Sequence, residues 1–135
     1  MPIAIWSDEY SVQIKDIDDQ HRGLVVLINS LYDAMQAGKS REELGELLGS
    51  LVDHTEFHFH TEERLFRVIA YKGGPEHVAE HTRLIDQVHE LQLNYESGQT
   101  VLTLEVMKFL RTWFTDHITG MDKRAARHLA GHGVR

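Results

Sequence analysis

Residues 40–69 read SREELGELLGSLVDHTEFHFHTEERLFRVI, and they are the most informative about the fold. Ser40 and Glu43 form a capping box, which is typical of the start of a helix. Beyond it, the predicted inward-facing residues recur at spacings of three and four, which is the helical period. They are Leu44, Leu47, Leu51, His54, His58, Glu62, Leu65 and Ile69. The pattern predicts one long helix whose inner face turns from leucine to histidine and glutamate.

Three other segments show the same period. One helix is expected over residues 18–37, with Asp16 or Asp18 as its N-cap and Gly38 just after its end. A second should open with Pro75 as its first residue and end at Gly98, and a third should cover residues 100–119 before Gly120 interrupts it. Their inward-facing positions are His21, Leu24, Ile28, Leu31 and Met35, then His77, His81, Leu84, Val88, Leu91 and Tyr95, and finally Leu102, Val106, Phe109, Trp113 and His117.

Four amphipathic helices joined by short loops predict an all-α fold, an antiparallel up-down-up-down four-helix bundle. The residues through Ile17 should form an irregular N-terminal arm, with Trp6 and Tyr10 packed against the bundle. A short basic C-terminal helix or tail should follow the fourth helix. We expect residues 1–135 to form a single domain, with part of residues 70–74 as a loop.

The composition narrows the classes of function. The chain of 135 residues carries 14 Lys and Arg against 21 Asp and Glu, a net charge of −7. This acidic balance argues against nucleic acid or an anionic membrane surface as a partner. No apolar run is long enough for membrane insertion, and the first ten residues lack the basic start of a signal peptide. The absence of cysteine excludes disulfides and thiolate metal sites and fits the cytoplasmic protein that we expect. We also expect a monomer.

The informative residues are the polar ones on the inner faces of the helices. In an up-down-up-down bundle, five histidines and Glu62 meet at one level near one end: His21, His58, His77, His81 and His117. His58 and Glu62, like His77 and His81, are four residues apart and can point to one centre. Asp122 lies five residues after His117, so the helix must loosen near Gly120 before both can reach that centre.

Seven converging donors are too many for one metal ion and suit two, with the two carboxylates as bridges and the five imidazoles as terminal ligands. No Glu stands three residues before a His, so the Glu-x-x-His pairs of ferritin-like di-iron proteins are absent. A site dominated by neutral imidazole favours ferrous iron and a mild, reversible reaction with dioxygen. The bland alternative for any single histidine is a hydrogen-bonded structural residue of the core.

In these residues the chain resembles the single-domain bacterial hemerythrins. The similarity lies in residues 6–12 (WSDEYSV), in 17–21 (IDDQH), in the H-F-x-x-E-E of 58–63, in the H-x-x-x-H of 77–81 and in the H-x-x-x-x-D of 117–122. Each motif is weak alone, but the ordered set spans nearly the whole chain. The loop at residues 72–75 (KGGP) departs from the family pattern, as does His54, where the family often has an aromatic residue.

The resemblance implies a non-haem di-iron centre bridged by Glu62, Asp122 and a solvent-derived oxygen. One iron would take His77, His81 and His117, and the other His21 and His58. The second iron would keep an open position, where O2 binds end-on and is held as hydroperoxide. The implied function is reversible dioxygen carriage, storage or delivery to an unknown recipient. The alternatives are a di-iron oxidase, a peroxidase or nitric-oxide-handling enzyme, and an oxygen or redox sensor that acts through a partner.

The other conspicuous side chains have more ordinary interpretations. Five apolar residues could line a dioxygen pocket or serve as packing: Leu24, Ile28, Phe59, Trp113 and Phe114. His54 is expected to be a core histidine bonded to a neighbouring group, and Glu63 a solvated charge. The remaining histidines should face solvent: His60, His89, His128 and His132.

Overall fold

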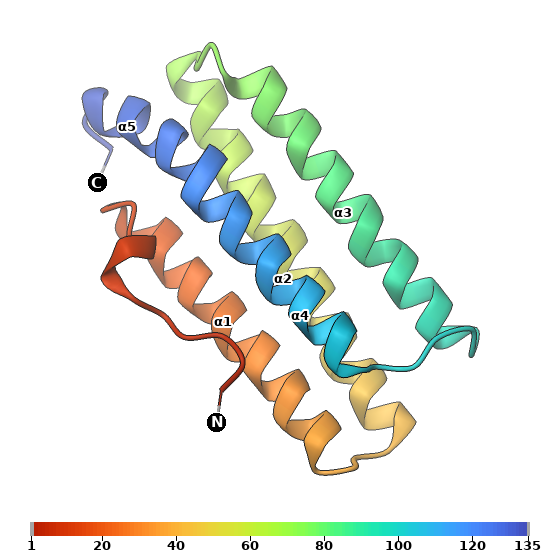
Figure 1. Ribbon diagram of the computed structural model, residues 1–135. Helices are drawn as coiled ribbons and strands as arrows, with labels where there is room; N and C mark the ends of the chain where they lie inside the picture. The colour runs from red at the N-terminus through yellow and green to blue at the C-terminus, as the bar shows by residue number, and fades with distance from the viewer. Residues whose placement is uncertain (1, 135) are drawn as a thin grey trace.

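The computed structural model describes residues 2–134, and within them it contains helices and no strand. The helices are α1 (Lys15–Gln36), α2 (Arg41–Ile69), α3 (Gly74–Glu96), α4 (Leu104–His117) and α5 (Lys123–Gly131). A 3-10 turn, Asp8–Tyr10, lies in the N-terminal arm, and a π-helical turn, Ile118–Asp122, joins α4 to α5. Figure 1 shows α1 to α4 side by side and alternating in direction, so the predicted four-helix bundle is confirmed. Residues 1 and 135 of the expected domain lie outside the described residues.

The capping box begins α2 as predicted. Ser40 Oγ accepts a hydrogen bond of 3.1 Å from the backbone N–H of Glu43. The preceding helix ends as predicted too, with Gly38 at φ +70°, a conformation that favours glycine.

The predicted N-cap of α1 is wrong. The helix begins at Lys15, three residues early, because Val12 and Ile14 are buried and draw the arm close to the bundle. Asp18 therefore lies inside the first turns of the helix. Its carboxylate accepts hydrogen bonds from the backbone N–H of Val12 at 2.8 Å and from Ser11 Oγ at 2.6 Å. It fastens the arm to α1 instead of capping the helix.

The loop between α2 and α3 is short, as expected. Ala70 ends α2 in the left-handed region at φ 52°, and α3 begins at Gly74, which makes Pro75 its second residue instead of its first. Gly73 supports the ring of Tyr71 so closely that a Cβ would lie 2.6 Å from the Tyr71 hydroxyl oxygen. A side chain at position 73 would displace Tyr71 from its buried position.

The buried face of α2 is wider than its predicted stripe. Leu51, His58 and Glu62 are buried as expected, but Leu44 and Leu47 are only half-buried. The additional buried residues are Leu48, Val52, Thr55, Phe59, Thr61 and Phe66. This follows from the position of α2, which packs against both α1 and α3 and so buries two faces.

On α4, Phe109 was expected inside but is 41% exposed. The buried apolar residues of this helix are Met107, Leu110, Trp113 and Phe114. The phase of the apolar stripe on α4 was therefore misjudged, although His117 does face inward.

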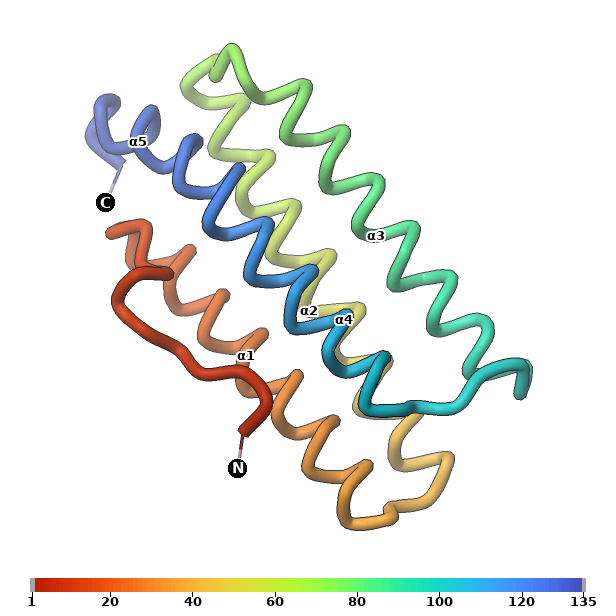
Figure 2. The backbone as a smooth tube through the Cα atoms, viewed as in Figure 1, coloured from red at the N-terminus to blue at the C-terminus, as the bar shows by residue number. Residues whose placement is uncertain are grey.

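Two apolar cores hold the molecule together. The main core fills the bundle and includes partly buried contacts from Trp6 and Tyr10 of the arm, as predicted. The second core joins the arm, α5 and the α2–α3 loop at the other end: Val12, Ile14, Ile17, Phe66, Tyr71, Ala125, Ala126 and Leu129. Figure 2 shows the arm running along α1 and meeting α5 near the start of α1. The expected C-terminal helix or tail is a helix, α5, and it packs on the bundle.

The level between the two cores is where the polar residues lie. His21 follows Ile17 of the second core and precedes Leu24 of the main core, and Glu62 lies between Phe59 and Phe66 in the same way. Among the described residues, no helix is long and apolar enough to cross a membrane.

Candidate metal centre

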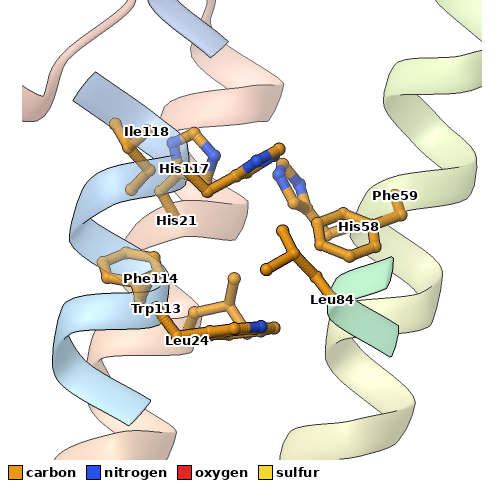
Figure 3. A pocket seen from close by; sticks show the side chains of 9 residues that line it. All are labelled: His21, Leu24, His58, Phe59, Leu84, Trp113, Phe114, His117 and Ile118. Atoms are coloured by element: carbon orange, nitrogen blue, oxygen red, sulfur yellow. The ribbon is translucent and has the colours of Figure 1, made fainter. Parts of the chain in front are cut away.

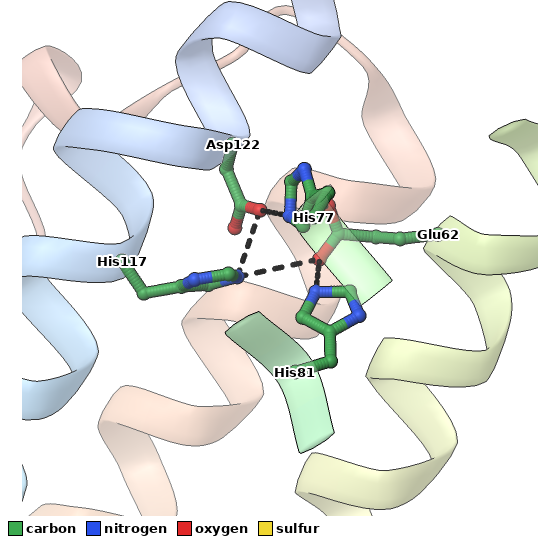
Figure 4. Close-up of side chains that lie close together, drawn as sticks. All are labelled: Glu62, His77, His81, His117 and Asp122. Atoms are coloured by element: carbon green, nitrogen blue, oxygen red, sulfur yellow. Dashed lines mark hydrogen bonds and ion pairs between the residues drawn. The ribbon is translucent and has the colours of Figure 1, made fainter. Parts of the chain in front are cut away.

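The structure brings all seven predicted donor residues together at one level of the bundle. The potential ligand atoms form two groups, and within each group all the atoms lie within 4.8 Å of one another. One contains Glu62, His77, His81, His117 and Asp122 (Figure 4), and the other contains His21, His58, Glu62 and Asp122. Both groups share the two carboxylates, and all seven side chains are buried.

Regular helical spacing positions four of these residues. His58 and Glu62 are one turn apart on α2, with His58 Nε2 at 2.8 Å from Glu62 Oε1. His77 and His81 are one turn apart on α3, and their ring centroids are 4.5 Å apart. The i,i+4 spacing seen in the sequence therefore does direct both pairs inward.

Asp122 reaches the centre through a π-helical turn. Residues Ile118–Asp122 form this turn, whose hydrogen bonds span five residues and so return Asp122 to the face that carries His117. Asp122 Oδ1 lies 2.9 Å from His117 Nε2. The expected loosening near Gly120 is confirmed, but Gly120 does not interrupt the helix, because α5 continues directly from the turn.

The two carboxylates lie between the imidazoles. Asp122 Oδ2 is 2.9 Å from His21 Nε2, and its Oδ1 is 2.9 Å from His77 Nε2. Glu62 Oε1 is 3.6 Å from His81 Nε2, and Glu62 Oε2 is 3.8 Å from His77 Nε2. Each carboxylate thus faces histidines of both groups.

Several of these pairs are within hydrogen-bond distance but lack hydrogen-bond geometry, so many atoms at the centre have no hydrogen-bond partner among the described residues. They include the Nε2 atoms of His21, His58, His81 and His117, together with Glu62 Oε1 and Asp122 Oδ2. Leaving so many buried polar atoms unpaired is costly unless something else satisfies them. Imidazole nitrogens and carboxylate oxygens that face one another are the donor set that binds divalent transition metals. The residues present therefore fit a metal centre.

The electrostatics also favour cation binding. Burial, with help from neighbouring His21, holds the pKa of His58 well below its usual range, and burial beside His117 and His77 lowers the pKa of His81 to about 2. Both imidazoles are therefore neutral at physiological pH and offer a lone pair. Burial and the facing Asp122 raise the pKa of Glu62 well above its usual range. Burial acts in the same direction on Asp122, but the surrounding histidines, His117 first, hold its pKa well below the usual range.

A second set of polar residues lies beside the Nδ1 atoms of the histidines, which are the outer ring nitrogens that face away from the centre. Gln20 Oε1 lies 2.7 Å from His58 Nδ1, Glu63 Oε2 lies 3.1 Å from His81 Nδ1, and Glu80 Oε1 lies 3.9 Å from His117 Nδ1. None of these three contacts was predicted from the sequence, and the interpretation of Glu63 as a solvated charge is wrong, since this side chain is only 17% exposed. The sequence did contain a signal for these three residues. Each residue directly neighbours a predicted donor on its own helix and contacts a histidine of the adjacent helix.

A small cavity adjoins the His21–His58 group. Its volume is about 10 Å³, roughly the space that the centre of one water-sized molecule needs. Its lining residues, drawn in Figure 3, are His21, Leu24, His58, Phe59, Leu84, Trp113, Phe114, His117 and Ile118. Four of the five apolar residues predicted for a pocket do line it. The fifth, Ile28, is buried in the main core instead.

The other histidines behave largely as expected. His54 is half-buried and donates from Nε2 to the backbone carbonyl of Gln20 at 3.1 Å, which confirms a core histidine bonded to a neighbouring group. It occupies the space beside Gly23, where a Cβ would come within 3.0 Å of its ring. His60, His128 and His132 are exposed, whereas His89 is half-buried and pairs with Glu56.

Comparisons with known proteins agree with this arrangement. Residues 12–129 match the family described as "Hemerythrin HHE cation binding domain". A bacteriohemerythrin of Pseudomonas aeruginosa is 34% identical over all of this chain and 89% of its own length, and one of Methylococcus capsulatus is 30% identical over 91% and 94%. A crystal structure of wild-type hemerythrin superposes with a TM-score of 0.89 at 29% identity, over 95% of this chain and 98% of its own. The chain therefore belongs to the hemerythrin family.

Proposed function

We propose that this chain holds two iron ions and binds dioxygen reversibly, for carriage, storage or delivery. In this proposal His77, His81 and His117 hold one iron and His21 and His58 hold the other. Glu62 and Asp122 bridge them, since their oxygens belong to both groups of potential ligand atoms. When bound, the ferrous pair supplies two electrons that dioxygen takes up and returns.

The observation that carries the proposal is the position of the cavity. It lies against both His21 and His58, the group with fewer imidazoles, whereas of the other group only His117 lines it and His77 and His81 do not. An iron held there by two imidazoles and two shared carboxylates would have room for a further ligand, and the cavity adjoins these two imidazoles. A volume of about 10 Å³ suits a ligand of very few atoms.

The walls of the cavity favour reversible binding over catalysis. Apart from three histidines, its lining is apolar, and it offers no polar group to orient a larger substrate. Leu24, Phe59 and Trp113 exclude water and protons, which promote irreversible oxidation of a ferrous centre. We therefore propose a binding protein rather than an oxidase or peroxidase. The family match over residues 12–129 supports one hemerythrin-like domain over most of these 135 residues.

The test is anaerobic loading with ferrous iron, followed by repeated cycles of oxygen and argon under optical observation. The expected result is two irons per chain by elemental analysis and a spectrum that returns fully under argon. A single iron per loaded chain would contradict the dinuclear assignment. Continuous consumption of an added reductant or peroxide, without a reversible spectrum, would support an enzyme instead.

A further inference from the structure

Gln20 connects three residues of α2 to α1. Its side-chain oxygen lies 2.7 Å from His58 Nδ1, and its Nε2 donates to Thr61 Oγ1 at 3.3 Å. Its backbone carbonyl accepts the hydrogen bond from His54. Gln20 thereby fixes one face of α2 beside the centre without contributing a donor atom to it.

This network determines the orientation of the Gln20 amide. Thr61 Oγ1 donates its proton to the carbonyl of Phe57 at 3.1 Å, so it must accept from Gln20. The amide nitrogen of Gln20 therefore faces Thr61, and the oxygen faces His58. Since an amide oxygen only accepts, His58 carries its proton on Nδ1 and presents the lone pair of Nε2 to the centre.

The surroundings of the two histidine groups differ in charge. On the side of His77, His81 and His117, one outer nitrogen meets a carboxylate directly, because Glu63 Oε2 lies 3.1 Å from His81 Nδ1. Glu80 Oε1 lies 3.9 Å from His117 Nδ1, beyond hydrogen-bond distance, and His77 Nδ1 has no hydrogen-bond partner within residues 2–134. On the side of His21 and His58, the only outer contact within residues 2–134 is the neutral amide of Gln20, because His21 Nδ1 has no partner there. A carboxylate makes an imidazole a stronger electron donor than an amide does.

We propose that Gln20 is a positioning residue with two effects on the His21–His58 group. It fixes the tautomer of His58, and it keeps the outer surroundings of this group uncharged, so that a metal there remains more resistant to oxidation than its neighbour. The second effect rests on the proposed function, because it requires a redox-active metal. The first effect does not.

Three variants of the full chain test this. Gln20→Leu removes the acceptor, Gln20→Glu keeps the acceptor and adds a charge, and Glu63→Gln is the matched control that removes a charge from the other group. Circular dichroism first confirms helicity. Ring ¹⁵N shifts of labelled histidine in the metal-free protein then report the tautomer of His58, and anaerobic titration with Co²⁺ against a chelator measures affinity for each metal equivalent.

In the parent, His58 should be the Nδ1–H tautomer and two Co²⁺ should bind. In Gln20→Leu the tautomer should become mixed, and one equivalent should bind about 10- to 100-fold more weakly, as for other lost outer contacts. Gln20→Glu should keep the Nδ1–H tautomer of His58 and the parental Co²⁺ affinity, and it should lower the midpoint potential of the iron-loaded protein. Glu63→Gln should raise that potential. The opposite sign in the two charge variants is a readout that simple damage to the fold does not produce.

The inference is overturned by Gln20→Leu with an unchanged His58 tautomer and parental affinity for both equivalents. It is also overturned if Gln20→Glu and Glu63→Gln shift the potential in the same direction. Failure of the proposed function is distinguishable. A parent that binds two Co²⁺ but shows no reversible oxygen spectrum refutes the carrier function, while the tautomer and affinity results still decide the role of Gln20.

Discussion

Removal of Asp122 should uncouple metal binding from the stability of the bundle. This carboxylate lies 2.9 Å from Nε2 of His21, His77 and His117, so it contacts both histidine groups. In Asp122→Ala the apolar faces of the helices are unchanged, and the helical content should be preserved. The two groups, however, lose one of their two shared carboxylates, and metal affinity should fall sharply.

The size of the effect follows from linkage. A metal present at about 100 times its Kd stabilises the folded state by about 2.7 kcal/mol. For a chain of this length, about 2.1 cal/mol/K per residue gives an unfolding entropy near 0.28 kcal/mol/K, so the melting temperature should rise by about 10 °C. We expect this difference between metal-loaded and chelator-treated parent, and only a small fraction of it in Asp122→Ala.

The assay is thermal unfolding followed by circular dichroism, with and without chelator, beside elemental analysis. Asp116→Ala is the matched control, because Asp116 is exposed on α4 one residue before His117 and belongs to neither donor group. Asp116→Ala should keep the full metal-dependent rise in melting temperature. Two irons, a reversible oxygen spectrum and an undiminished shift in Asp122→Ala would refute the bridging role of this residue.

Three further predictions concern pH, the cavity and His54. In the presence of a chelator, the free energy of unfolding should decrease on acidification, most steeply below pH 4.5. His58 and His81 stay neutral in the folded protein, because their pKa values are lowered, but they bind protons near pH 6.5 in the unfolded chain. The raised pKa of Glu62 opposes this loss of stability, but only above pH 4.5, because below that pH Glu62 is protonated in both states. Urea midpoints that are equal at pH 6 and pH 4 would contradict this. Trp113→Ala should cost about 3–5 kcal/mol of stability by opening a cavity and should accelerate irreversible oxidation of the iron-loaded protein, measured by the decay of its oxygen spectrum; an unchanged decay would show that this wall does not exclude water. His54→Phe should cost about 1 kcal/mol through its lost hydrogen bond and leave iron content and oxidation rate nearly unchanged, so a large change in oxidation rate would contradict its role as a structural residue.

The sequence was most informative where spacing alone sets direction. Ser40 and Glu43 predicted the start of α2, and the i,i+4 pairs predicted which way His58, Glu62, His77 and His81 point, because a regular helix leaves little freedom in either case. Asp122 was predictable only conditionally. Its spacing from His117 required an irregular turn, and the structure supplies one.

The misjudged positions share a physical cause, which is tertiary packing. The face of α2 widens because two helices cover it, and α1 starts early because buried Val12 and Ile14 bring the arm to its first turn. The outer contacts of Gln20, Glu63 and Glu80 each join two helices, so periodicity within one helix carries little information about them. The same residues look like ordinary surface polar residues until the adjacent helix is in place.

The π-helical turn also fixes the rotational phase of α5. A turn of this kind contains one residue more than an α-helical turn, and each residue of an α-helix rotates the chain by about 100°. The π-helical turn therefore takes up one additional residue without changing the phase of the helix that follows it. If the turn relaxed to a regular α-helix with all its residues kept, Asp122 would leave the face of His117 and α5 would turn by about that angle relative to α4. The exposed Arg124 would then take the buried place of Ala125, and Ala126 would move to an exposed one. The turn thus keeps two registers at once, that of a carboxylate in the centre and that of the apolar face of α5. Deleting Gly120, by contrast, should let a regular α-helical turn form with both registers kept, because the acid would then stand four residues after His117.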